Sequence, residues 1–554
     1  MIIRISTRHN IGTMPQRFND YKMYKAVMED DFFEPKTYLE AITCKQGHLW
    51  KEAMEEELQS LEKNQTWEEI DLPKGKTTVG SKWVYKTKDD NDDIRMKARL
   101  VAQGFSQKYG VNYDEVFAPV AKTTTLRLLL SIAEKRKYRV RQYDVKTAFL
   151  NGKLEEEVYM RQPPGYGREK KVLKLKKSIY GLKQAAKVWN ETLNNVLIKN
   201  NFKRNEYDKC LYTLERNNET IHVLVHVDDL LVTGSNEADM IKTMKNVGKE
   251  FELKDLGNIK HYLGIDVDQD SKGNYSISQG RYIDKIMEAA NLEDSKTSVY
   301  PMDTGYYKLE GELLDTNEFF RNLIGMLLFL STHSRPDVAA CVGILSKKVL
   351  NPRDVDLMEA KRIIKYLKGS RNLKLKMSDP DALQELHAYS DANWAEDRND
   401  RKSNSGYFCS INGGAISWCS RKQETVATSS AESELMALTE TCKEMKRLRN
   451  LTESLKENVP EKMLIFTDSQ SCISMITNEK YSNKTKHIDT KYHYVRDLFT
   501  NKEINLQYVN TELNTADLMT KPLAGTKTST LRKLAGLVSD SGGVLNIESD
   551  TNGR

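Results

Sequence analysis

Two adjacent aspartates, Asp228 and Asp229, lie between two apolar stretches and constrain the fold more than any other feature of the sequence. Before them, apolar residues recur at every second position from Ile221 to Val227, which predicts a strand with one buried face. After them, a second apolar run ends at Gly234, so the pair is predicted to lie at the turn of a β-hairpin. Two carboxylates held together at a partly buried turn repel each other, and a divalent cation relieves that repulsion.

A third aspartate adds weight to the hairpin pair. An Asp-Asp pair is common in ordinary turns, so the pair alone does not indicate a metal site. Asp144, however, ends another apolar-flanked stretch, Gln142-Tyr143-Asp144-Val145. Carboxylate oxygens are the ligands that Mg²⁺ prefers, and the sequence therefore favours a divalent-metal site formed by Asp144 and the hairpin pair.

Several sequence blocks occur in the order that is typical of one family. The chain resembles the reverse transcriptase and ribonuclease H of copia-type LTR-retrotransposon Pol polyproteins from about residue 34 to about residue 523. The blocks are Lys97-Ala98-Arg99-Leu100-Val101-Ala102-Gln103-Gly104-Phe105, Phe117-Ala118-Pro119-Val120, Tyr143-Asp144-Val145-Lys146-Thr147-Ala148-Phe149-Leu150, Tyr180-Gly181-Leu182-Lys183-Gln184 and the Asp-Asp hairpin. The resemblance implies an α+β and α/β multidomain fold, in which a right-hand polymerase of fingers, palm and thumb precedes a ribonuclease H-like mixed sheet flanked by helices.

The resemblance and the local patterns together predict five segments. They are a flexible lead-in (1–33), reverse transcriptase fingers and palm (34–305), thumb and tether helices (306–383), a ribonuclease H-like domain (384–524) and a flexible tail (525–554). The tripeptide Asp303-Thr304-Gly305 is that of aspartic proteases, but it lacks the apolar strand such a site needs. It is predicted to be a linker turn.

Composition limits the class of protein and its compartment. With 554 residues, 39% hydrophobic and 30% charged, the chain is expected to be globular and soluble. No apolar run approaches the length of a bilayer span, so no membrane partner is expected. Seven cysteines without a Cys-x-x-Cys spacing indicate reduced thiols. The expected location is the cytoplasm, within a virus-like particle if the element is intact, or the nucleus.

Four residues are candidates for binding the incoming nucleotide. Lys97 and Arg99 lie on a hairpin predicted over residues 79–101, where cations suit capture of a triphosphate. The resemblance implies that Phe149 stacks under the sugar and excludes a 2′-hydroxyl, and that Gln184 lies near the nucleotide. The competing interpretations are edge-strand charges for the cations, a core position for Phe149 and a surface position for Gln184.

A second set of carboxylates resembles the ribonuclease H family in its order. Asp391 lies near the end of one predicted strand and Asp468 ends another. Asp517 lies at the start of a predicted last helix, and a helical glutamate lies between the first two aspartates. Hard oxygen ligands from strand ends and one helix are what a two-metal nuclease requires. The resemblance therefore implies a second site that cuts the RNA strand of an RNA–DNA hybrid.

Two glutamates compete for the helical position of this site. The buried face of the helix is expected to consist of Leu435, Leu438, Cys442 and Met445. At about 100° per residue, Glu434 lies roughly 60° from the centre of that face and Glu432 roughly 100° from it. Glu434 is therefore the predicted ligand, with Glu432 as the alternative.

The resulting hypothesis is an RNA-directed DNA polymerase with ribonuclease H activity. Its expected cofactor is Mg²⁺, two ions per active site, with Mn²⁺ as a substitute. Its expected partners are an RNA template, a DNA primer strand, the RNA–DNA hybrid and dNTPs, together with the capsid and integrase of the same element. A net charge of +6 permits nucleic-acid binding without requiring it.

One residue departs from the family pattern. Copia-type enzymes usually have tyrosine where this chain has His226, and an imidazole cannot replace the packing and hydrogen bond of a phenol. The chain also begins after the point where capsid, protease and integrase segments would precede it, which suggests a processed product, a truncated copy or a gene prediction. The competing hypothesis is a decayed or co-opted copy that binds nucleic acid without efficient catalysis.

Overall fold

The computed structural model describes residues 34–90, 93–167, 171–216, 219–478 and 489–539. The chain divides into two compact units: unit 1 is Met1–Ala118 with Thr147–Asn195, and unit 2 is Pro119–Lys146 with Val196–Arg554. The predicted lead-in, 1–33, lies outside the described residues, as does the end of the predicted tail.

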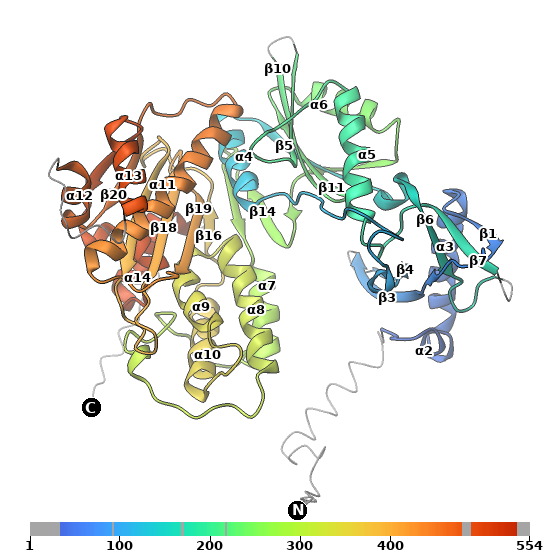
Figure 1. Ribbon diagram of the computed structural model, residues 1–554, viewed down its shortest axis with the longest axis horizontal. Helices are drawn as coiled ribbons and strands as arrows, with labels where there is room; N and C mark the ends of the chain where they lie inside the picture. Colours follow the sequence, from blue (N-terminus) through green and yellow to red (C-terminus); the bar gives the residue numbers. More distant parts are fainter. Residues whose placement is uncertain (1–33, 91–92, 168–170, 217–218, 479–488, 540–554) are drawn as a thin grey trace, which may run out of the picture. The chain divides into compact units, whose positions relative to one another are not determined.

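Unit 1 combines a four-stranded sheet, ordered β1-β7-β6-β2, with a separate two-stranded hairpin (Figure 1). The buried face of α3 presents Trp50, Met54 and Leu61, and the Trp50 ring packs edge-on against Tyr85 of the hairpin at 5.2 Å. Its elements are α2 (Tyr38–Thr43), α3 (Gly47–Lys63), β1 (Trp67–Asp71), β2 (Thr78–Val79), β3 (Ser81–Asp90), β4 (Asp93–Ala102), β6 (Lys153–Arg161), β7 (Lys171–Lys177) and most of α5 (Ala185–Lys199), with short 3₁₀ turns η2 (Gly104–Ser106) and η3 (Ala148–Asn151).

The hairpin predicted over residues 79–101 is confirmed as the antiparallel pair β3–β4. Its register sets Lys86 opposite Lys97 and Val84 opposite Arg99. Lys86 forms an ion pair with Glu34 at 2.6 Å, which accounts for its charge without a ligand.

Unit 2 begins with a six-stranded sheet ordered β12-β5-β11-β10-β9-β8. The hairpin predicted around Asp228 and Asp229 is confirmed, because β10 and β11 pair antiparallel from Ile221–Gly234 to His226–Asp229. The elements of this part are α4 (Thr123–Arg136), β5 (Arg139–Val145), β8 (Lys203–Arg204), β9 (Leu211–Arg216), β10 (Glu219–His226), β11 (Asp229–Gly234), α6 (Glu237–Val247) and β12 (Leu253–Asn258).

A second sheet of unit 2, ordered β13-β14-β15-β16-β22, joins segments far apart in the sequence. Asp303-Thr304-Gly305 forms the predicted turn, with the Gly305 N–H donated to Asp303 Oδ1 at 2.7 Å. The elements are β13 (His261–Tyr262), β14 (Ile265–Gln269), β15 (Tyr275–Ser278), α7 (Gly280–Ala290), η4 (Tyr306–Lys308), α8 (Glu318–His333), η5 (Pro336–Val338), α9 (Ala339–Ser346), α10 (Asp354–Gly369), β16 (Lys374–Lys376), α14 (Gly525–Leu534) and β22 (Leu537–Val538).

The beginning of the predicted tail is structured, which corrects that expectation. Residues 525–538 form α14 and β22, and β22 pairs with β16. Leu531, Ala535 and Leu537 are buried in the unit 2 core. The ten residues of α14 include few apolar positions, so the sequence shows little helical periodicity of apolar residues there. The segment is buried because β22, which follows α14, pairs with β16.

The last part of unit 2 is a five-stranded mixed sheet ordered β19-β18-β17-β20-β21, with α11 packed on β17 (Figure 1). Strands β17, β18 and β19 are antiparallel, whereas β17, β20 and β21 are parallel. This mixed sheet with flanking helices confirms the predicted fold class. The elements are β17 (His387–Asn393), β18 (Asn404–Ile411), β19 (Gly414–Lys422), α11 (Ser430–Ser454), β20 (Met463–Thr467), α12 (Gln470–Thr477), α13 (Asp489–Thr500), β21 (Ile504–Tyr508), η7 (Thr511–Leu513) and η8 (Thr515–Met519).

A hydrophobic core runs through unit 2 from α4 to the mixed sheet and α11, and a second core lies among α7, α8, α9 and α10. Within the first core, the buried Arg127 of α4 donates to the carbonyls of Ile416, Thr332 and His333 at 2.8–3.1 Å and stacks on the Trp418 ring at 3.8 Å. The predicted boundaries at 305/306 and 383/384 therefore fall inside one compact unit. Among the described residues, no helix combines the length and apolar character that crossing a membrane requires.

His222, inside strand β10, makes the stability of unit 2 sensitive to acid. Its side chain is 3% exposed, its Nδ1 lies 3.0 Å from the Thr213 hydroxyl, and burial lowers its pKa from 6.5 to about 4, against a smaller opposing effect of Glu215. Below pH 6.5 the unfolded chain binds a proton that the folded chain does not, so the free energy of unfolding falls with pH by about 3 kcal/mol in total by pH 4.

We expect His222→Gln, which keeps a hydrogen-bonding group beside Thr213, to remove this part of the acid sensitivity. The measurement is chemical denaturation of both chains at pH 7 and pH 4, since other titrating groups cancel in the difference. The exposed histidine His48 provides the control variant, His48→Gln. Equal acid sensitivity of wild type and His222→Gln would contradict the assignment.

Candidate functional sites

The predicted aspartates Asp144, Asp228 and Asp229 meet at one end of the six-stranded sheet. Antiparallel pairing of β5 and β11 sets Asp144 directly opposite Asp229. The turn is tied to β5 as well, because the Val145 N–H donates to the Asp228 carbonyl at 2.8 Å. Cross-strand neighbours have Cβ atoms roughly 5 Å apart, so three carboxyl groups share a small region.

The turn that carries Asp228 has a strained backbone. The loop between β10 and β11 consists of Val227 and Asp228, and Val227 has φ 56°. A positive φ at the first loop residue of a two-residue hairpin is usually supplied by glycine, and a β-branched side chain there is costly. The surrounding pairing therefore holds the turn in a conformation that the residue itself does not favour.

The charges at this turn are in conflict. Burial raises the pKa of Asp229, and the negative charges of Asp228 and Asp144 act in the same direction. A hydrogen bond from Gln142 Nε2 at 3.2 Å opposes this shift. Half-buried carboxylates in mutual repulsion are a donor set that a hard divalent cation fits. His226, the residue that departs from the family pattern, is half-buried and pairs in register with Asp229.

A second acidic cluster lies on the mixed sheet. Asp391 on β17, Glu434 on α11 and Asp468 after β20 have carboxylate oxygens within 4.8 Å of one another. Among the described residues, this is the one group of three acidic, histidine or cysteine side chains whose possible ligand atoms all lie within 4.8 Å of one another. The parallel pairing of β17 with β20 brings the two aspartates to the same sheet edge, as the sequence predicted.

The structure distinguishes the two candidate glutamates. Glu432 accepts hydrogen bonds from the Thr428 N–H and hydroxyl, both at 2.6 Å, while its own N–H donates to Ser429 Oγ. Glu432 therefore belongs to the N-terminal cap of α11. Glu434 turns toward Asp391 and Asp468, and within the described residues its Oε2 is buried without a hydrogen-bond partner.

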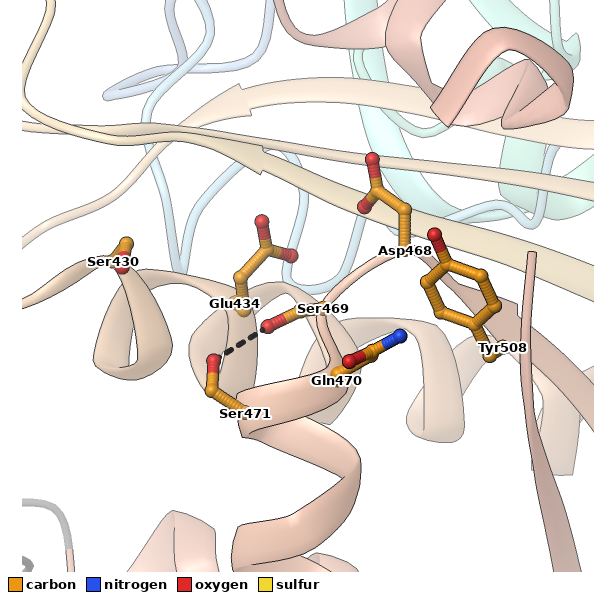
Figure 2. A pocket seen from close by; sticks show the side chains of 7 residues that line it. All are labelled: Ser430, Glu434, Asp468, Ser469, Gln470, Ser471 and Tyr508. Carbon is orange, nitrogen blue, oxygen red and sulfur yellow. Dashed lines mark hydrogen bonds between the residues drawn. The ribbon is translucent and has the colours of Figure 1, made fainter. Parts of the chain in front are cut away.

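The cluster borders an open hollow of about 430 Å³ (Figure 2). Figure 2 shows the carboxyl groups of Glu434 and Asp468 leaning toward each other at its edge. An orphaned carboxylate oxygen beside a polar hollow is suited to a divalent cation and a phosphate group. The lining residues are Ser430, Glu434, Asp468, Ser469, Gln470, Ser471 and Tyr508.

Asp517, the fourth predicted carboxylate, is not among the three whose oxygens lie within 4.8 Å of one another, although its charge acts on Asp391. Its side chain is 0% exposed and forms ion pairs with Lys521 at 2.6 Å and Lys527 at 2.8 Å. Lys521 also lies 3.5 Å from Asp391 Oδ2, which accepts a further hydrogen bond from the Thr520 hydroxyl. Sequence reasoning does not identify Lys521, and the only signal for it in the sequence is its position one turn after Asp517.

Burial and charge shift the acid strengths of this cluster. Burial raises the pKa of Asp391 to about 7. The positive charge of Lys521 opposes this shift, and the negative charge of Asp517 adds to it. Burial and the charges of Asp391 and Asp468 raise the pKa of Glu434 well above its usual value. Such shifts are typical of functional sites whose charge is completed by a ligand.

Three predicted or neighbouring side chains of unit 1 form a continuous stack. The Arg99 guanidinium lies over the Tyr180 ring at 4.6 Å, and the Tyr180 ring meets Phe149 edge-on at 4.7 Å. Lys97, two residues before Arg99 on β4, is half-buried. The sequence block that contains Tyr180 predicts no role for this residue, and its position between Arg99 and Phe149 follows only from the fold.

Gln184 is a buried member of a hydrogen-bond network in unit 1. It is 1% exposed, its Nε2 donates to the Asn112 carbonyl at 2.9 Å, and its Oε1 accepts from Gln107 Nε2 at 3.0 Å. The competing interpretation of Gln184 as a surface residue is therefore wrong. In this structure the amide supports the 107–112 loop from within.

Comparisons with known proteins agree on one group. The family described as "Reverse transcriptase (RNA-dependent DNA polymerase)" matches residues 64–304. The chain is 35% identical over 536 residues to the "Retrovirus-related Pol polyprotein from transposon TNT 1-94" of Nicotiana tabacum. The aligned region covers 94% of this chain and 40% of that polyprotein. This chain thus spans well under half the length of that relative.

A shorter relative is covered completely. The chain is 32% identical over 308 residues to the putative transposon Ty5-1 protein of Saccharomyces cerevisiae, covering 54% of this chain and 100% of that protein. Among solved structures, the foamy viral protease-reverse transcriptase in complex with dsDNA matches 83% of this chain and 83% of its own, with 13% identity and a TM-score of 0.43. That score gives no residue-by-residue correspondence.

Proposed function

Because this chain belongs to the reverse transcriptase family of copia-type retrotransposon Pol polyproteins, we propose that it is an RNA-directed DNA polymerase that also hydrolyses the RNA strand of the hybrid. The observation that carries the polymerase proposal is the register that sets Asp144 opposite Asp229, beside the strained turn of Asp228. The observation that supports the nuclease is the convergence of Asp391, Glu434 and Asp468.

In the polymerase site, Asp144, Asp228 and Asp229 would hold two Mg²⁺ ions, with Mn²⁺ as a substitute. Bound at either set of carboxylates, these ions supply a Lewis acid that neutralises developing charge on phosphate oxygens and activates the attacking oxygen. The pairing of β5, β10 and β11 keeps the three carboxylates in place before substrate arrives, so little reorganisation is needed.

We assign the proposed nucleotide-binding roles to four residues of unit 1. Lys97 and Arg99 would bind the triphosphate, since guanidinium and ammonium groups are the preferred donors to phosphate. Phe149 would contact the sugar, and its stacking on Tyr180 limits the movement of its ring. Gln184 would act by holding the 107–112 loop in place.

In the nuclease site, Asp391, Glu434 and Asp468 would hold the metal, with Asp517 as the fourth carboxylate. The polar hollow beside them would accept the scissile region of the RNA strand. Recognition there would rest on duplex shape and 2′-hydroxyl contacts rather than on base sequence. The proposed partners are an RNA template, a DNA primer, dNTPs and the capsid and integrase of the same element, in the cytoplasm or nucleus.

The test of the polymerase is incorporation of labelled dTTP on poly(rA)–oligo(dT) with Mg²⁺. We expect activity from the wild-type chain and at least roughly a hundredfold loss in Asp228→Asn, which removes a ligand charge from the turn. The matched control is Asp255→Asn on β12, an aspartate of the same sheet whose side chain pairs with Arg141. Equal loss in both variants would point to damage to the sheet rather than to a metal site.

His226 supports a second candidate, a copy that binds nucleic acid without efficient catalysis. The same assay with His226→Tyr separates the two. Wild-type activity that rises in His226→Tyr would indicate a working but impaired enzyme. Absence of incorporation in both chains, with retained binding of an RNA–DNA hybrid, would contradict the polymerase proposal and leave the binding-only copy.

A further inference from the structure

The anchoring of Asp517 differs from that of the other nuclease carboxylates. Both of its oxygens are buried, and among the described residues neither accepts a properly directed hydrogen bond. The charge is instead balanced by two ammonium groups, Lys521 at Oδ1 and Lys527 at Oδ2. A carboxylate with both oxygens so engaged is poorly placed to bind a divalent cation as well.

The two lysines differ in where else they reach. Lys521 extends toward the cluster and lies 3.5 Å from Asp391 Oδ2, whereas the second contact of Lys527 is Glu512 at 3.4 Å, away from the cluster. The charge of Lys521 also acts on Glu434 and Asp468. Lys521 is therefore the one of the pair whose ammonium lies between Asp391 and Asp517.

An ammonium group and a divalent cation cannot share this space. An oxygen-bound Mg²⁺ needs ligands at about 2.1 Å, closer than the ammonium contacts seen here, and like charges repel strongly where water is excluded. Asp391, Glu434, Asp468 and Asp517 carry four negative charges when ionised, and Lys521 and Lys527 offset two of them. The remaining charge matches a single divalent ion.

We propose that Lys521 takes the place of one cation in the nuclease site, so that the free enzyme binds a single divalent ion there. The second ion binds only when the Lys521 ammonium leaves the space between Asp391 and Asp517. An incoming phosphate group is the chemistry that can draw it away, since ammonium and phosphate pair strongly. This inference rests on the proposed nuclease function and makes Lys521 a positioning residue that delays completion of the site.

The test is the number of Mn²⁺ ions bound per chain, measured by titration calorimetry without nucleic acid. To silence the polymerase site, every chain carries Asp144→Asn and Asp228→Asn. We expect one ion whose binding is lost on adding Asp468→Asn, and two such ions in Lys521→Met. Lys527→Met, which removes the other partner of Asp517 but no contact with Asp391, should still bind one.

Each outcome bears on the inference. Two ions in the chain that retains Lys521, or one in both that chain and Lys521→Met, would overturn the role of Lys521 but leave the nuclease proposal standing. No Asp468-dependent binding in any chain would overturn the nuclease proposal itself. Melting curves monitored by circular dichroism identify a variant that does not fold, and Lys521→Gln then replaces Lys521→Met.

Discussion

Replacing Asp468 by asparagine is expected to lower hydrolysis of the RNA strand roughly a thousandfold, while dTTP incorporation stays within about twofold of wild type. Three carboxylates converge in the proposed nuclease site, so this single change removes one of the carboxylate charges that would hold a metal. Asp468 follows β20, whereas the polymerase aspartates lie on β5 and at the β10–β11 turn. The shape of the side chain is preserved, so the fold should not change.

The measurement uses one hybrid substrate with a labelled RNA strand and a labelled DNA primer, so that both activities are read in the same tube. Asp228→Asn should give the opposite result, with primer extension lost and RNA cleavage retained. Parallel loss of both activities in either variant would mean that the two sites are not independent. Retained RNA cleavage in Asp468→Asn would exclude the cluster as the nuclease site.

The two glutamates at the start of α11 provide a matched pair for the same assay. Glu434→Gln should abolish RNA cleavage, because this side chain faces Asp391 and Asp468. Glu432→Gln should keep cleavage and cost about 1 kcal/mol of stability, because it weakens only the cap formed with Thr428. The reverse result would make Glu432 the ligand.

The features that the sequence predicted correctly depend on local pattern. Alternating apolar residues up to Val227 and the apolar run after Asp229 identify a hairpin and its turn, because burial of one strand face fixes the register. The same local logic identifies the β3–β4 hairpin and the strand that carries Asp391. These predictions require no knowledge of distant contacts.

The features that could not be predicted from the sequence depend on tertiary contacts. No pattern around Gln184 indicates that its amide is buried between Gln107 and Asn112. The sequence places Lys521 one turn after Asp517 but does not indicate Lys527, because the contact with Lys527 forms only when α14 packs against η8. Carboxylate order along the chain thus predicts the members of a site, whereas the charge balance depends on neighbours brought in by folding.

Asp337→Ala is expected to destabilise unit 2 by about 3–5 kcal/mol, the largest stability effect predicted for a single change. Asp337 and Arg335 are each 2% exposed and form a two-point ion pair, with Nε–Oδ1 at 2.9 Å and Nη2–Oδ2 at 2.7 Å. Tyr366 donates to the same carboxylate at 2.6 Å, and Arg532 of α14 donates to the Tyr366 hydroxyl at 3.2 Å. Removing the carboxylate leaves a buried guanidinium without its counter-charge.

The double variant Arg335→Met/Asp337→Leu separates the cost of an unpaired charge from the value of the pair. Two apolar side chains of similar volume remove both charges, so most of the stability lost in Asp337→Ala should return. Glu424→Ala, which breaks the exposed pair with Arg421, should leave the urea unfolding midpoint unchanged. The urea unfolding midpoints of the three variants are compared directly. A double variant as unstable as Asp337→Ala would show that the ion pair itself stabilises the helices around Tyr366, and that the unpaired Arg335 charge is not the cause of the instability.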